Sequence, residues 1–134
     1  MILVDTTVLI DIVKGVQNDK ADLFKKIIKS DLVYGISEYT YLEMLQGART
    51  DNEYSQLSDY LLDMNIYFLP KTLATYEKAS SIYRSLRRQG ITPRSTIDIL
   101  IALTAIEYDL SLLHNDKDFD EMSEKLSAFK VYPQ

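Results

Sequence analysis

Short continuous apolar runs alternate along the chain with segments whose apolar residues recur at helical spacing. Met1 to Val4 is an apolar run closed by Asp5, which predicts a buried parallel strand. Further short, β-prone segments predict strands at 32–36, 66–69, 110–113 and 129–132. Helical spacing predicts one helix that follows Thr6 and Thr7 and ends near Gly15, and others at 22–29, 37–47, 51–64, 72–88, 97–108 and 120–126. Strands that alternate with helices predict an α/β fold with a largely parallel central sheet flanked by helices, and 134 residues suit one domain, 1–134.

Composition restricts the chemistry that this chain can perform. It contains no Cys and one His, so a disulfide framework, a thiolate metal site and a His-rich zinc site are all excluded. A metal would be held mainly by oxygen, which favours Mg²⁺ or Mn²⁺. No apolar run approaches the ~18 residues needed to span a bilayer, so we expect no membrane span and a cytoplasmic protein.

Positive charge is scarce and concentrated. The net charge of −5 argues against non-specific binding of nucleic acid. Four of the five Arg residues nevertheless fall in one stretch, at 84, 87, 88 and 94. Arg84, Arg87 and Arg88 can share one helix face and contact RNA phosphates there. The alternative is a solvated helix end, where cations interact favourably with the helix dipole.

Asp98 is the most informative residue, because the helix at 97–108 is apolar on every side. Such a helix is buried, and a lone carboxylate in it loses hydration unless it is paired or bound to a metal. The alternative places Asp98 in the first turn, where it faces exposed N–H groups and the positive end of the dipole. Both interpretations are compatible with a metal ligand at a helix start beside a cleft.

Three other carboxylates have positions from which they can converge with Asp98. Asp5 ends the first strand and Asp116 follows the strand at 110–113, and sites in open parallel sheets form beyond the carboxyl ends of strands. Glu43 shares its helix face with Thr40 and Gly47. Taken singly, Asp5 also suits a helix N-cap, Asp116 a turn and Glu43 an ordinary surface position.

Crowded carboxylates repel one another, and a divalent cation removes this cost. Two carboxylates ~5 Å apart cost ~3 kcal/mol at an effective dielectric constant of 20. A bound cation also lowers the pKa of water and stabilises charge on a phosphodiester. The sequence offers no nucleophile–His–acid arrangement and no glycine-rich phosphate-binding motif as a rival route.

The four acidic segments, in their order and spacing, resemble the motifs of PIN domains, and of VapC-type toxins in particular. Val4-Asp5-Thr6-Thr7-Val8 is similar to the opening motif, and Ser37 to Ala48, with Thr40, Glu43 and Gly47, to the second. Asp98-Ile99-Leu100-Ile101-Ala102 resembles the third, and Leu112 to Phe119 the fourth, so the resemblance covers nearly the whole chain.

This resemblance implies a PIN-like fold and the toxin of a type II toxin–antitoxin pair, an endoribonuclease that hydrolyses RNA phosphodiester bonds with Mg²⁺ or Mn²⁺. It implies an acidic metal site made of Asp5, Glu43, Asp98 and Asp116, supported by the Thr7 hydroxyl. Asp118 would support the site or cap the next helix. It also implies a VapB-type antitoxin as partner and a homodimer. One departure is His114, which stands where the family usually has Thr; it is either a neutral residue at a strand end or a contact to substrate.

Two other functions agree with part of the sequence. A haloacid-dehalogenase-type phosphatase also begins with an Asp after a strand, but it needs a second Asp where this chain has Thr7. A non-catalytic module that binds protein or RNA would use the ten Tyr residues and the amphipathic helices at 51–64 and 72–88. Such a module has no reason to keep Asp98 within an apolar helix.

Overall fold

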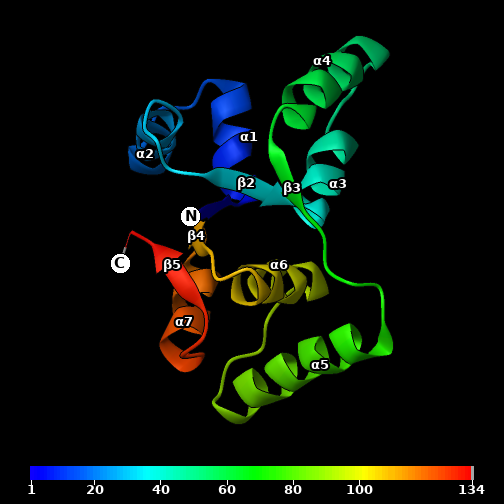
Figure 1. Cartoon of the computed structure of the whole chain (residues 1–134), viewed down its shortest axis with the longest axis vertical. Coiled ribbons are helices and arrows are strands. Elements are labelled where there is room, and N and C mark those ends of the chain that lie inside the picture. Colours follow the sequence, from blue (N-terminus) through cyan, green and yellow to red (C-terminus); the bar gives the residue numbers. More distant parts are fainter. Residues whose placement is uncertain (134) are drawn as a thin grey trace.

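The computed structural model describes residues 1–133, which form a five-stranded parallel sheet flanked by helices (Figure 1). The strands are β1 (Ile2–Val4), β2 (Tyr34–Ser37), β3 (Asn65–Tyr67), β4 (Ser111–Leu113) and β5 (Lys130–Tyr132). The helices are α1 (Thr6–Lys14), α2 (Asp19–Ile28), α3 (Glu38–Gln46), α4 (Asp51–Leu62), α5 (Leu73–Arg88), α6 (Thr96–Glu107) and α7 (Lys117–Lys125). The strand order is β3-β2-β1-β4-β5, and every neighbouring pair is parallel. The predicted α/β fold with a parallel sheet is confirmed.

β1 is the central strand, and its side chains supply both faces of the core. Ile2 and Val4 pack with α1, α2 and Leu61 of α4 on one face, whereas Leu3 packs with α5, α6 and α7 on the other. This division follows from the alternation of side chains along a strand. Figure 1 shows the same arrangement, with α1, α2 and α4 on one side of the sheet and α5 and α6 on the other. None of the helices within 1–133 has the length and apolar character needed to cross a bilayer.

The helices begin at polar side chains that accept a backbone N–H in the first turn. These N-caps are Asp5, Asn18, Ser37, Thr50, Thr72, Ser95 and Asp116. At the other end of α1, Gly15 adopts a left-handed conformation with φ of 73°, as its place after the helix predicted. Two of the candidate ligands, Asp5 and Asp116, are therefore fixed at the junction of a strand and a helix.

Several boundaries differ from the sequence prediction. α2 begins at Asp19 and α7 at Lys117, three residues before the predicted starts, because polar caps at Asn18 and Asp116 allow a first turn without apolar residues. β2 begins at Tyr34 instead of residue 32, because parallel pairing starts where Tyr34 lies opposite Ile2. Leu32 and Val33 remain exposed. β3 ends at Tyr67, two residues before the predicted end.

Candidate metal centre

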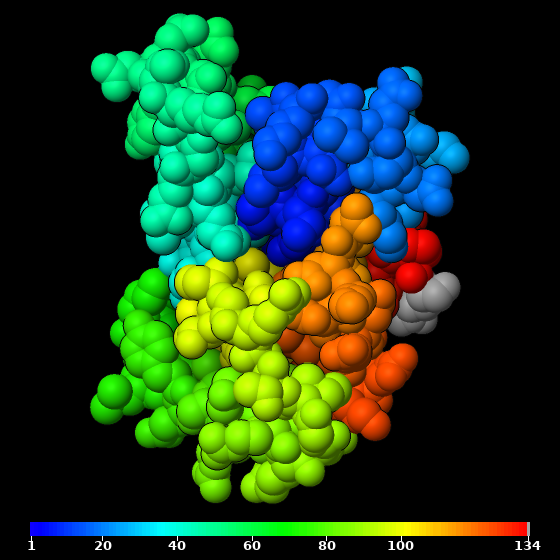
Figure 2. All heavy atoms as spheres, turned by 180° about the vertical axis from the view of Figure 1, so that it is seen from behind, coloured from blue at the N-terminus to red at the C-terminus, as the bar shows by residue number. Residues whose placement is uncertain are grey.

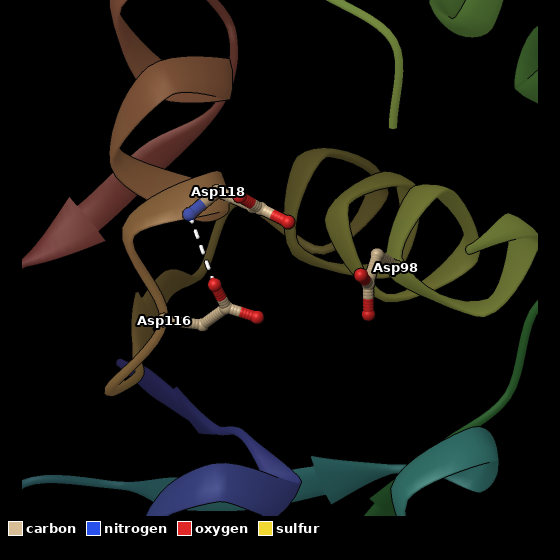
Figure 3. Close-up of side chains that lie close together, drawn as sticks. All are labelled: Asp98, Asp116 and Asp118. Carbon is tan, nitrogen blue, oxygen red and sulfur yellow. Dashed lines mark hydrogen bonds between the residues drawn. The ribbon is translucent and has the colours of Figure 1, made fainter. Parts of the chain in front are cut away.

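Three aspartates converge where α6 and α7 begin. Asp98 lies in the first turn of α6, Asp116 caps α7 and Asp118 lies in the first turn of α7. One carboxylate oxygen from each lies within 4.8 Å of the other two. Figure 3 shows Asp116 and Asp118 extending from the start of α7 toward the helix that carries Asp98. The Asp118 backbone N–H donates to Asp116 Oδ1 at 3.0 Å, which holds one of the three carboxylates in place.

Asp5 is buried beside this cluster and is held by Thr7. The Thr7 hydroxyl donates to Asp5 Oδ2 at 2.6 Å, and the Thr7 backbone N–H donates to the same oxygen at 3.1 Å. The Thr7 hydroxyl also accepts the backbone N–H of Asn115 at 2.9 Å, and Asp5 N–H donates to Leu113 O. Thr7 therefore joins the carboxyl ends of β1 and β4, and with them the Asp5 and Asp116 segments. Figure 2 shows the start of the chain (blue), the α6 segment (yellow) and the segment after β4 (orange) meeting on one face.

Glu43 is held by Thr6, which was expected to precede the first helix and is instead the first residue of α1. The Thr6 hydroxyl donates to Glu43 Oε1 at 2.7 Å and lies 3.1 Å from the Thr40 hydroxyl. Ser37 Oγ in turn accepts the backbone N–H of Thr40 at 3.0 Å. Adjacent residues of a helix point in directions about 100° apart. From the sequence alone, this angle indicates that the side chains of Thr6 and Thr7 face different partners.

The electrostatics of the five carboxylates show that they share one environment. Burial raises the pKa of Asp98 to about 6, and the charges of Asp5, Asp116, Glu43 and Asp118 add to the increase in that order. Burial also raises the pKa of Asp5, with a smaller contribution from Glu43, while the hydrogen bonds from Thr7 oppose the increase. Asp98 and Asp5, when ionised, thus lose hydration and are repelled by neighbouring carboxylates.

The donor set fits a hard divalent cation. All the clustered side-chain donors are carboxylate oxygens, the ligands preferred by Mg²⁺ and Mn²⁺. Three of them are close enough to contact one ion. A cation there would offset both the burial and the repulsion that raise the pKa of Asp98. The arrangement can therefore bind a metal ion and present it at a surface of the molecule.

Arg94 is a second residue at the site that was not predicted there. Its Nε donates to Asp118 Oδ2 at 2.8 Å, and its Nη2 lies 3.8 Å from Asp116 Oδ1. The available signal was its position in the loop four residues before Asp98. By contrast, Arg84, Arg87 and Arg88 are exposed on α5, and none of them forms an ion pair with an acidic residue within 1–133.

His114 is buried beneath the segment that carries Asp116. Its Nδ1 accepts the Asp116 backbone N–H at 3.1 Å. Its Nε2 lies 3.2 Å from Asp120 Oδ1, although the geometry there falls short of a hydrogen bond. Burial lowers the pKa of His114, which favours the neutral ring, with the proton on Nε2. The ring therefore supports the backbone of the segment that carries Asp116.

A groove of about 710 Å³ adjoins the centre between α1, α3 and α4. Its walls include Ile10 and Val13 of α1, Met44 of α3 and Tyr60 of α4. Glu43 lines this groove, and its charge also adds to the increase in the pKa of Asp98 that burial causes. The groove therefore lies on the Glu43 side of the candidate metal centre.

Comparisons with known proteins agree with this geometry. The chain is 29% identical over 121 residues to Ribonuclease VapC11 of Mycobacterium tuberculosis and to VapC ribonuclease Mb1587 of Mycobacterium bovis, covering 90% of each chain. Its fold is similar to that in the structure of VapBC2 from Rickettsia felis bound to a promoter DNA fragment, with a TM-score of 0.75, 15% identity and coverage of 98% of this chain and 97% of that chain. It is also similar to VapBC-1 of nontypeable Haemophilus influenzae, with a TM-score of 0.68, 21% identity and coverage of 92% and 94%. The sequence model that describes the PIN-domain family matches residues 2–125, and the chain therefore belongs to this family.

Proposed function

We propose that this protein is the toxin of a type II toxin–antitoxin pair and acts as a metal-dependent endoribonuclease on RNA phosphodiester bonds. The observation that carries the proposal is the convergence of carboxylates from four distant segments at one end of the sheet. The curated relatives named VapC ribonucleases support RNA as the substrate.

In this proposal, Asp5, Glu43, Asp98 and Asp116 hold Mg²⁺ or Mn²⁺. When bound, the cation supplies an activated water molecule and stabilises negative charge on the phosphodiester. The protein fixes the ligands before substrate binds: Thr7 orients Asp5, Thr6 orients Glu43, and the Asp118 N–H orients Asp116. Carboxylates fixed in this way need little rearrangement during the reaction.

The proposed partners are a VapB-type antitoxin and a second copy of the same chain, with 1–134 forming a single PIN domain. The similar solved structures support the antitoxin, because they are VapBC and FitAB complexes. Co-expression with the product of a small neighbouring reading frame tests this partner. A complex that suppresses RNA cleavage is the expected result.

RNA cleavage by purified protein tests the activity. We expect bacterial RNA to be cut in Mn²⁺ or Mg²⁺, and not after addition of a chelator. Asp98→Asn keeps the side-chain volume and removes a charged ligand, so it should abolish cutting. Asp59→Asn, on an exposed face of α4, is the matched control and should cut like the parent. Cleavage by Asp98→Asn at the parental rate, or cleavage that persists in chelator, would overturn the proposal.

A further inference from the structure

Arg94 is fixed beside the carboxylate cluster at both its backbone and its guanidinium group. It lies between Pro93, which is buried, and Ser95, which caps α6 by accepting the Ile97 N–H at 3.1 Å. The side chain reaches the start of α7, where its Nε donates to Asp118 Oδ2. The pair thus ties the loop before α6 to the first turn of α7.

Most of the guanidinium remains available to another ligand. The Arg94 side chain is 74% exposed even though it forms this ion pair. A guanidinium carries five N–H donors, and Nε–H is the one that donates within residues 1–133. The four N–H groups on the two terminal nitrogens form a planar fork of the kind that binds phosphate oxygens.

The negative charge of the site favours a cationic side chain that can bind RNA. RNA is a polyanion, and here it would approach five carboxylates on a chain with a net charge of −5. Within 1–133, Arg94 is the one Lys or Arg side chain that forms an ion pair with any of these carboxylates. Its ion pairs with Asp118 and Asp116 place its positive charge directly beside the carboxylates.

We propose that Arg94 binds an RNA phosphate beside the metal centre, and that Asp118 acts as a positioning residue by holding the Arg94 guanidinium. This inference rests on the proposed function and deepens it. Asp118 belongs to the same three-carboxylate cluster as Asp98 and Asp116, and in this proposal its Oδ2 holds the Arg94 guanidinium instead of the cation. The competing explanation is that Arg94 occupies the cation position and masks the site until metal or RNA displaces it.

RNA affinity distinguishes the two explanations. The probe is a short fluorescent single-stranded oligoribonucleotide, measured in an Asp98→Asn background that prevents cleavage. We expect Arg94→Ala to weaken binding by about tenfold and to lower the salt slope by about 0.7, the loss of one phosphate contact. Lys78→Ala is the matched control, because it removes an equally short exposed ion pair, with Glu107 of α6, away from the carboxylates. Its affinity should equal that of the background protein.

In the cleavage-competent protein, Arg94→Ala should raise KM more than it lowers kcat. The thermal shift caused by Mn²⁺ should persist, because the metal ligands are intact. Unchanged or tighter RNA binding by Arg94→Ala, or faster cleavage, would overturn the proposal. It would favour the explanation that Arg94 occupies the cation position and masks the site.

A double-mutant cycle tests the positioning role of Asp118. The loss of affinity caused by Arg94→Ala should be smaller in an Asp118→Ala background, since an unanchored guanidinium contributes less. The comparison is made within each background, so any general repulsion between Asp118 and RNA cancels. An equal loss in both backgrounds would refute the positioning role. Failure of the parent to cut RNA would instead refute the proposed function, so the two failures are distinguishable.

Discussion

Replacing Asp98 by Asn should make the metal-free protein more stable while destroying its activity. The pKa of Asp98 rises from 3.8 to about 6 on folding, chiefly through burial and then through the neighbouring carboxylates. Between pH 3.8 and 6 the folded state therefore holds a proton that the unfolded state has released. Stability falls as pH rises through this window, and the penalty is complete above about pH 6.

The size of this penalty follows from the shift in pKa. A change from 3.8 to about 6 corresponds to about 3 kcal/mol at 1.36 kcal/mol per pKa unit. Asp98 is only half-buried, and solvent screening reduces this figure to about 1 to 2 kcal/mol. For a chain of this size, Asp98→Asn should raise Tm by on the order of 3 to 6 °C above pH 6.

Thermal and urea unfolding in chelator, from pH 4 to 8, measure the effect. The advantage of Asp98→Asn should be full at pH 7.5 and shrink as pH falls toward 4, whereas Asp59→Asn should follow the parent throughout. Added Mn²⁺ should then reverse the order: a ligand at 100 times its Kd adds about 2.7 kcal/mol to the parent, and the variant should gain little. A variant less stable than the parent in chelator at pH 7.5, or an advantage independent of pH, would refute this reasoning.

Three further changes test the groups around the ligands. Thr6→Val removes the hydroxyl that donates to Glu43 and should lower kcat by at least tenfold, while Thr6→Ser should retain most activity; equal rates for the two variants would show that this hydrogen bond is dispensable. His114→Asn keeps an acceptor near the Nδ1 position and should preserve Mn²⁺ affinity better than His114→Gln, as followed by metal-induced thermal shifts; the reverse order would contradict the role of Nδ1. Changing Arg84 and Arg88 together to Ala should weaken RNA binding across all sequences and reduce its salt slope, and an unchanged slope would mean that they contact no phosphate.

The elements that meet at the site could be predicted from the sequence, because each of them has a strong local pattern. The apolar run before Asp5 and the segment before His114 indicated β1 and β4, and the apolar surroundings of Asp98 indicated α6. The predicted starts of α2 and α7 were wrong, because the polar first turns of these helices carry no apolar periodicity. Only the caps at Asn18 and Asp116 mark where the helices begin.

Contacts between distant residues were beyond such reasoning. Thr6 and Glu43 are 37 residues apart, and no local pattern indicates that their side chains meet. The same holds for Arg94 and Asp118, which are 24 residues apart. The Arg residues on α5 share one helix face and were therefore predicted to bind RNA. The Arg in contact with the carboxylates lies in the following loop, where no periodicity exists. These pairings depend on how the sheet orders its strands.

The hydrogen bond between Thr7 and Asn115 has a consequence for the synthesis of this protein. It joins residues 108 positions apart, and β1 gains β4 as its neighbour only when residues 111–113 are available. When Asp5 and Glu43 emerge from the ribosome, Asp116 has not yet been synthesised. The nascent chain therefore carries two of the acidic groups without the third. The centre can form only after translation has passed the α7 segment. For the endoribonuclease proposed above, this order means that an incomplete chain still attached to its own message has no assembled metal centre with which to cut it.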